Sequence, residues 1–287
     1  MRILLIGAAG QLGQDLLSLL QRRGHEIVPV THEQLEICSR QAVREAVAAA
    51  RPQCIINTAA FHRVDDCEEQ AERTFAVNVM GVRNLAEEAE EAGTALANFS
   101  TDYVFGGERQ SPYRETDLPQ PLSIYAMSRL AGEFAVRAYC SRHFVIRTCG
   151  LYGMGGSRSK GGNFVETMLR LAAQKRTIRV VADQVVTPTY TADLGERVLP
   201  LIESQRYGLY HMTSTGQCSW HEFAAEVFRL AKVSADLHPT DSKSFGAKAR
   251  RPAYSVLDNC QMRAIGIEEF RPWSEALADY IHHRQTL

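Results

Sequence analysis

The chain has 287 residues, of which 45% are hydrophobic and 23% are charged, and its formal net charge is −1 at pH 7. This length and apolar content suffice for one large core, or for a large domain with a smaller one. The near-neutral charge and scattered basic residues argue against a nucleic-acid partner, and no apolar run approaches the ~18 residues that span a bilayer.

The chain opens with a predicted strand, a glycine loop and a helix. Residues 2–6 form a short apolar run typical of a buried strand, and leucines from 12 to 20 recur at helical spacing. Glycines between them let backbone N–H groups and the helix N-terminus approach a pyrophosphate, although an ordinary tight turn also uses glycine. The position directly after the first strand favours a dinucleotide site, formed by Gly7, Gly10, Gln11, Leu12 and Gly13.

Strands and helices then alternate. We expect strands at 27–30, 54–57 and 95–100, a helix at 40–50, and one continuous helix from about 68 to 91. This is the rhythm of an α/β fold with a Rossmann-type, doubly wound parallel sheet. Because ligands of such sheets bind beyond the carboxyl ends of strands, residues 57–60 and 100–103 should lie at the active site.

A tyrosine and an arginine share one face of the next predicted helix. Tyr125 precedes Arg129 by four residues, about one helical turn, and a strand is expected at 144–147. A phenol can protonate a carbonyl oxygen near neutral pH if nearby positive charge lowers its pKa from ~10. We therefore expect Arg129 to lower the pKa of Tyr125 and the pair to serve a reductase.

The regular alternation weakens after residue 150. A cationic glycine-rich loop at 153–162 is followed by helices expected at about 163–174 and 220–232. We expect residues 1–152 and 177–204 to form the dinucleotide-binding domain, and residues 153–176 and 205–287 to form a smaller α/β substrate-binding lobe.

The cysteines and the N-terminus indicate a cellular compartment. Seven cysteines, an odd number without C-x-x-C spacing, fit reduced thiols better than a disulfide framework or a zinc site. The first strand starts at residue 2, which leaves no room for a signal peptide. We expect a cytoplasmic protein.

Taken together, these motifs make the chain similar to the extended short-chain dehydrogenase/reductases, and within them to the dTDP-4-dehydrorhamnose reductases. The Ser-Thr-Asp-Tyr-Val-Phe run is the strongest marker. The motifs in chain order are Gly7-x-x-Gly10-x-x-Gly13, Asn57-Thr58-Ala59-Ala60 with Val64-Asp65, Ser100-Thr101-Asp102-Tyr103-Val104-Phe105, Tyr125-x-x-x-Arg129-Leu130-Ala131-Gly132-Glu133, Arg147-Thr148, Gly162-Asn163-Phe164, Asp183-Gln184 with Thr187-Pro188-Thr189, Gly208-Leu209-Tyr210-His211 and Ala249-Arg250-Arg251-Pro252.

The resemblance implies that a reduced nicotinamide delivers hydride to the C4 ketone of a dTDP-4-keto-6-deoxy sugar. Tyr125 would protonate the developing alkoxide while Thr101 hydrogen-bonds the same oxygen, and Arg129 would complete the catalytic set. The cofactor contacts it implies, besides the glycine loop, are Thr31, Glu36, Ile37, Ala59, Ala60, Phe61, Tyr125 and Arg129. Because Thr31 and His32 follow the second strand without an acidic residue that would repel a 2′-phosphate, NADPH is accepted, and NADH stays open.

The substrate contacts expected for the nucleotide sugar are Thr101, Asp102, Gly150, Asn163 and Arg250, with Arg251 and Lys160 as second choices. An amide and a guanidinium can recognise a base edge or diphosphate oxygens. No residues stand at metal-ligand spacing, so no metal is inferred. The sequence leaves open whether the chain is a monomer or a homodimer.

Two departures from the family pattern keep alternatives open. Arg129 stands where the family has lysine, and this exchange is not conservative at a geometrically demanding site. Gly150 stands where the family commonly has a sugar-stacking tryptophan, so we expect a wider pocket. The alternatives are a catalytically silent regulatory relative, such as the regulatory subunit of methionine adenosyltransferase, and a reductase or epimerase of another sugar nucleotide.

Overall fold

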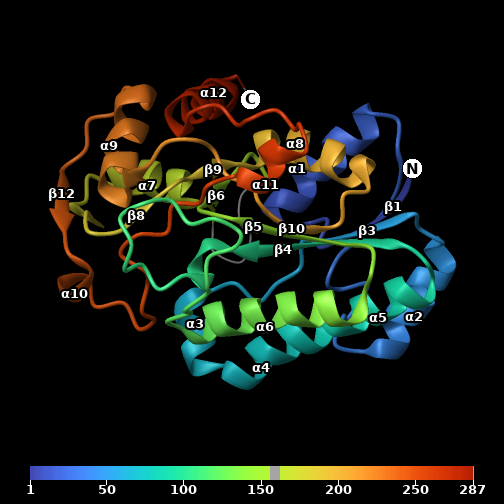
Figure 1. The fold of residues 1–287 in the computed structure, drawn as a ribbon. Coiled ribbons are helices and arrows are strands. Elements are labelled where there is room, and N and C mark those ends of the chain that lie inside the picture. Colours follow the sequence, from blue (N-terminus) through green and yellow to red (C-terminus); the bar gives the residue numbers. More distant parts are fainter. Residues whose placement is uncertain (156–161, 287) are drawn as a thin grey trace.

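A six-stranded parallel sheet forms the centre of the protein, described by a computed structural model for residues 1–155 and 162–286 (Figure 1). The strand order β10-β5-β4-β3-β1-β2 reverses direction beside β1, as a doubly wound sheet requires. The predicted Rossmann-type fold is therefore confirmed. The strands are β1 (Arg2–Ile6), β2 (Glu26–Val30), β3 (Cys54–Asn57), β4 (Ala95–Thr101), β5 (His143–Thr148) and β10 (Gly208–His211).

Helices cover both faces of this sheet because successive residues of each strand point to opposite sides. In β1, Ile3 and Leu5 belong to the core under α1 and α8, whereas Leu4 and Ile6 belong to the core under α2 and α5. Figure 1 shows α6 on the same side as α2 and α5. The bounds are α1 (Gln11–Arg22), α2 (Arg40–Ala50), α5 (Val82–Glu91), α6 (Ile124–Tyr139) and α8 (Thr191–Ser204).

The prediction of one continuous helix from about 68 to 91 is wrong in detail. The segment forms α3 (Val64–Glu69), α4 (Ala71–Phe75) and a π-helical turn (Ala76–Gly81) before α5 begins. The wider turn lets α6 come close, because the position of a Cβ on Gly132 lies 2.4 Å from the carbonyl oxygen of Asn78. Single π-turns within helices are frequent at functional sites.

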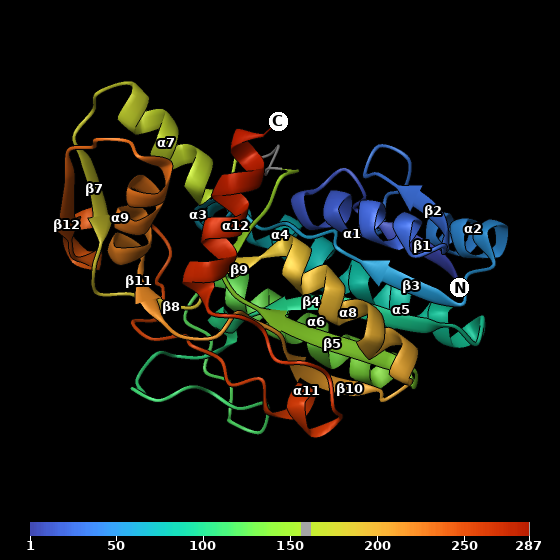
Figure 2. The same ribbon diagram turned by 90° about the horizontal axis from the view of Figure 1, so that it is seen from above.

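A smaller lobe lies at one end of the sheet (Figure 2). Its own apolar core includes Tyr152, Val165, Phe223 and Tyr280. The predicted domain boundary differs from this arrangement at two strands. β7 (Ile178–Val181) pairs with β12 (Leu237–Thr240) in the small lobe, while β10 completes the main sheet beside β5. Short strands carry too little periodicity to reveal their partners, so the sequence placed both in the wrong unit.

The remaining elements complete the small lobe and the connections to it. No helix in the described ranges is long and apolar enough to cross a membrane. These elements are β6 (Leu151–Tyr152), α7 (Phe164–Ala173), β8 (Val185–Val186), β9 (Thr189–Tyr190), β11 (Cys218–Ser219), α9 (Trp220–Ala231), α10 (Ser242–Phe245), α11 (Cys260–Ala264) and α12 (Trp273–Gln285), with a 3₁₀ turn at Asp102–Val104.

Replacing Gly132 should reveal how tightly α6 packs on the π-turn. Gly132→Ala should lower the free energy of unfolding by about 2 kcal/mol, because the added methyl meets a backbone oxygen that cannot rotate away. Urea unfolding measures this. Gly195→Ala in α8 is the control, since its nearest atoms are flexible leucine side-chain ends; equal effects of the two changes would contradict the packing argument.

Candidate active site

The glycine loop after β1 forms a backbone cradle at the start of α1. The N–H groups of Gly7 and Ala8 both donate to the carbonyl of Val30, at 2.9 and 3.1 Å, which ties the loop to the end of β2. Gly10 is the N-cap residue of α1. It has no side chain that could cap the helix, so the first turn of α1 presents its backbone N–H groups. A Cβ on Gly13 would lie 2.3 Å from the oxygen of Gly7, so the close approach of helix and loop requires glycine.

Two buried asparagines hold the segment after β3. The Asn57 amide oxygen accepts from the N–H of Ala59 at 3.1 Å, and its nitrogen donates to Asn98 at 2.8 Å. Asn78, in the π-turn, accepts from the N–H of Phe61 and donates to its carbonyl, both at 2.9 Å. The predicted cofactor segment from 59 to 61 is thus a backbone strip held at both ends.

The candidates near the end of β2 occupy different environments. Thr31 is half-buried, and its N–H donates to Gln34. The Glu36 carboxylate accepts from the N–H of Cys38 at 3.0 Å, and this hydrogen bond lowers the pKa of Glu36. Ile37 is 4% exposed and packs against Gly81, so it contributes to the core as well as to the segment that follows β2.

Tyr125 lies in the first turn of α6, where its phenol meets the end of β4. Ser123 caps the helix by accepting from the N–H of Ala126, which places the positive end of the helix beside the ring. The phenol hydrogen-bonds the hydroxyl of Thr101, and the ring of Tyr103 packs edge-on against it with centroids 6.1 Å apart. Two residues predicted as catalytic, from separate elements, are therefore in contact.

The predicted lowering of the Tyr125 pKa is wrong in its net direction. Burial raises the pKa of Tyr125 above 10, while the charge of Arg129 and the hydrogen bond with Thr101 pull it down by less. The sequence shows the cation one turn away but not the apolar surroundings that disfavour a phenolate. At neutral pH the phenol is consequently protonated and able to donate.

Arg129 is buried between α6 and β4, with 6% of its surface exposed. One terminal nitrogen donates to the carbonyl oxygen of Phe99, whereas the buried Nε has no hydrogen-bond partner in the described residues. A buried N–H without a partner is costly and is expected where a ligand completes the site. This orphaned donor, together with the glycine cradle, fits a dinucleotide whose ribose hydroxyls would reach Arg129.

Asp102 is less accessible than a substrate contact would be. Its carboxylate is 2% exposed and accepts from Thr101 at 3.0 Å, from Ser255 at 2.5 Å and from the thiol of Cys149. Burial raises the pKa of Asp102 despite these bonds. Its evident role in the structure is to orient Thr101 and to tie the C-terminal segment to β4.

The other substrate candidates differ in their partners and exposure. Asn163 caps α7, and its amide nitrogen already donates to Gly153 and Tyr280, at 3.0 and 3.2 Å. Arg250 is exposed. Arg251 is committed to a bidentate pair with Asp65 at 2.9 and 3.2 Å, and Lys160 lies outside the described residues.

Gly150 has close neighbours in the small lobe and the segment before β9. Gly150 has a φ of +54°, and the position of a Cβ there lies 3.1 Å from the ring of Trp220 and 3.2 Å from the Cα of Pro188. Neighbouring groups fill the space where a side chain would begin. Trp220 packs against Phe164 in the small lobe.

Sequence reasoning missed a set of buried polar residues that support the site. Asn78 was hidden within an apparently ordinary helix, although an asparagine between Val77 and Val79 is a signal of a buried polar contact. Glu133 and Arg147 were recognised only as motif letters. They form a buried ion pair at 2.7 Å, with side chains 2% and 3% exposed. The pair lies behind the end of β4 that carries Thr101, which we call the catalytic edge.

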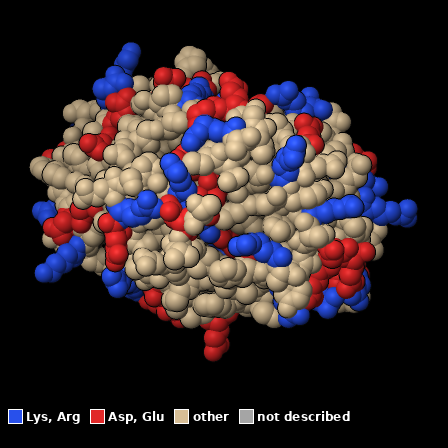
Figure 3. All heavy atoms as spheres, viewed as in Figure 1, with Lys and Arg blue, Asp and Glu red and all other residues tan. Residues whose placement is uncertain are grey.

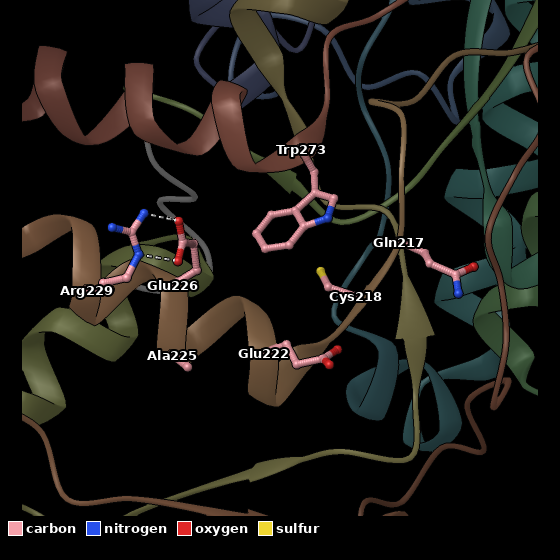
Figure 4. Close-up of a pocket in the computed structure, with 7 residues that line it drawn as sticks. All are labelled: Gln217, Cys218, Glu222, Ala225, Glu226, Arg229 and Trp273. Atoms are coloured by element: carbon pink, nitrogen blue, oxygen red, sulfur yellow. Dashed lines mark hydrogen bonds and ion pairs between the residues drawn. The ribbon is translucent and has the colours of Figure 1, made fainter.

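The pocket drawn in Figure 4 lies away from this edge. It measures about 390 Å³ and lies along α9 and at the start of α12 in the small lobe. Its wall includes Cys218, Trp273 and the ion pair of Arg229 with Glu226, none of which is a site candidate. Within the described ranges no group of three or more His, Cys, Asp or Glu could hold a metal, and all seven cysteines are free thiols.

The surface also carries no concentrated charge on the face shown in Figure 3, where basic and acidic side chains are interspersed. Several of them pair across elements. Arg40 and Arg44 of α2, for example, contact Glu88 of α5 at 3.0 Å each.

A parallel sheet with a glycine cradle, a Tyr-Arg helix and a Thr at the adjoining strand end define a dinucleotide-binding protein of the short-chain dehydrogenase/reductase class. The sequence profile of one family, the RmlD substrate binding domain, matches residues 1–286. The chain belongs to this family, which confirms the predicted resemblance.

Individual relatives match over nearly their full length. The chain is 38% identical over 285 residues to the spore coat polysaccharide biosynthesis protein SpsK of Bacillus subtilis, covering 99% of this chain and 98% of that protein. It is 40% identical over 285 residues to a dTDP-4-dehydrorhamnose reductase of Streptomyces griseus, covering 97% and 92%. The crystal structure of a Bacillus anthracis dTDP-4-dehydrorhamnose reductase in complex with NADP superimposes with a TM-score of 0.95 at 38% identity, covering 98% and 99%.

His211 of β10 should make stability depend on pH. Burial lowers its pKa from 6.5 to about 3, and the charge of Arg147 adds to the effect. The unfolded chain therefore takes up a proton at a higher pH than the folded protein does. The resulting stability is complete above pH 6.5 and is lost as the pH falls towards 3, at up to about 1.4 kcal/mol per pH unit.

Urea unfolding at a series of pH values tests this expectation. His211→Gln should flatten the acid decline relative to the parent protein. His282→Gln, on the exposed face of α12, is the control and should leave the decline unchanged. Parallel curves for the parent and His211→Gln would show that another group controls acid unfolding.

Proposed function

We propose that the chain is an NAD(P)H-dependent reductase of the C4 ketone of a dTDP-4-keto-6-deoxy sugar, acting as a dTDP-4-dehydrorhamnose reductase. The observation that carries the proposal is the contact of Tyr125 with Thr101 beside a partly unsatisfied Arg129. Relatives that match nearly the whole chain carry the same activity in their names.

The glycine loop and the strip from 59 to 61 hold the cofactor. Backbone N–H groups at the start of α1 would hold the pyrophosphate, and Arg129 would hold the nicotinamide ribose through its unpaired Nε. No acidic residue directly follows β2, where Thr31 and His32 stand, so NADPH fits and NADH is not excluded. The cofactor supplies hydride; the protein supplies position and a proton.

Tyr125 acts as the general acid. Because burial keeps its phenol protonated at neutral pH, it can donate to the sugar oxygen as negative charge develops there. Thr101 donates a second hydrogen bond to that oxygen in exchange for its bond to Asp102. Arg129 then stabilises the phenolate that remains, which is why a cation belongs one turn away.

The relatives favour this function over the alternatives left open by the sequence. The hypothesis of a silent regulatory relative rested on Arg129 and Gly150. The charge of Arg129 still acts on the phenol, and a Cβ at Gly150 would lie 3.1 Å from the ring of Trp220. Neither departure removes a group that the proposed chemistry needs. The substrate class is a nucleotide sugar; a cytoplasmic location and the oligomeric state stay predictions.

Tyr125→Phe should abolish most of the activity. We expect the turnover of a dTDP-4-keto-6-deoxy sugar, followed as loss of NADPH absorbance, to fall about 10²–10⁴-fold, because the proton donor is gone. NADPH binding, followed by fluorescence, should be retained. Tyr139→Phe, at the exposed end of α6, is the control.

Each other outcome has a definite reading. Equal rates for Tyr125→Phe and the parent protein would refute the assignment of the acid. Tight NADPH binding by the parent without sugar turnover would support a silent relative, and sugar conversion without net NADPH loss would support an epimerase.

A further inference from the structure

Directly behind the catalytic pair, two opposite charges are buried together. Glu133 of α6 and Arg147 of β5 form two parallel hydrogen bonds, at 2.9 and 2.7 Å, and neither side chain is more than 3% exposed. Such bidentate pairs are strong and directional. Burying them is costly unless every remaining donor and acceptor is also satisfied.

The surrounding groups satisfy the carboxylate and bind the guanidinium on its other side. The hydroxyl of Ser100 donates to Glu133 at 2.5 Å. On the other side, Arg147 lies 3.4 Å from Nε2 of His211 and packs over the ring of Phe105. His211 is kept neutral by burial, and its Nδ1 donates to the carbonyl of Tyr113, so its Nε2 can accept from Arg147. The carboxylate of Glu133 is therefore fully occupied.

Glu133 is also four residues beyond Arg129 on the same helix. Residues at this spacing are neighbours on a helix surface, and opposite charges there normally pair. The two side chains do reach adjacent residues of β4, since Arg129 donates to the carbonyl of Phe99 and Glu133 accepts from Ser100. Among the described residues, however, Glu133 has its ion pair with Arg147, and Arg129 has none.

We propose that Arg147 is a positioning residue that withholds Glu133 from Arg129. With the carboxylate one helical turn away engaged elsewhere, the guanidinium of Arg129 keeps its charge and its Nε for the phenol of Tyr125 and the cofactor ribose. The inference rests on the proposed function and deepens it. In this role Arg147 contacts neither the cofactor nor the sugar. It acts by pairing with Glu133, which then does not pair with Arg129.

The decisive comparison is between a single and a double variant. In Arg147→Gln, Glu133 is released and pairs with Arg129, so the dissociation constant for NADPH should rise about tenfold. In the double variant Glu133→Gln and Arg147→Gln, no carboxylate competes, and NADPH affinity should return to within about threefold of the parent value. Fluorescence titration without sugar measures both. A merely structural role for the pair predicts that the double variant binds no better than the single one, and that result overturns the proposal.

The pH dependence of reduction gives a second readout. In Arg147→Gln the phenol loses the influence of a free cation, so the rate at neutral pH should fall and its alkaline decline should move up by about one pH unit. The double variant should restore both. An unshifted profile in Arg147→Gln, with folding intact by circular dichroism, would also count against the proposal.

Two arms remain informative if Arg147→Gln does not fold. Arg147→Lys keeps a cation beside Glu133 and should bind NADPH as the parent does, even if it melts earlier. The double variant buries no charge at either position and must also bind like the parent. Loss of binding in either folded protein contradicts the proposal. Because these arms use NADPH alone, they stand even if the parent fails to reduce the sugar, which would reject only the proposed function.

Discussion

A buried guanidinium without a carboxylate beside it is the constraint around which the catalytic edge is organised. Arg129 reaches a backbone carbonyl of β4, but its Nε is unsatisfied and its charge is not neutralised by an ion pair within the described residues. Left alone, such a group destabilises the fold. Proteins tolerate this cost where a ligand or a reaction uses the charge, and the phenol of Tyr125 lies next to it.

The neighbouring backbone is correspondingly rigid. Asn57 and Asn78 hold the strip from 59 to 61 by direct hydrogen bonds, and the π-turn brings Asn78 within reach of α6, where it also contacts Ser128 at 3.0 Å. Each of these bonds is modest, but a site that acts by position depends on all of them. A displacement of α6 by a fraction of an ångström would move phenol and guanidinium together.

The small lobe is coupled to the same edge by polar contacts. Ser255, from the C-terminal segment, donates to Asp102, which in turn accepts from Thr101. Arg251 pairs with Asp65 at the start of α3, and this pairing lowers the pKa of Asp65. Hydrogen bonds thereby join the C-terminal segment to the strand end and helix start that carry the candidate site, although these parts are distant in the chain.

The sequence by itself determined the parallel sheet, and it predicted the glycine cradle and the candidate reacting groups. These follow from local rules: strand and helix periodicity, glycine where backbone must approach closely, and a Tyr-Arg pair one turn apart. Only the tertiary structure decided the environment of those groups. The pKa of Tyr125 depends on burial as well as on Arg129, and the amide of Asn163 is already hydrogen-bonded. The partners of β7 and β10, and the arginine that pairs with Glu133, also come from distant parts of the chain. Desolvation and ion pairing act through space, and one sequence without its fold does not specify those distances.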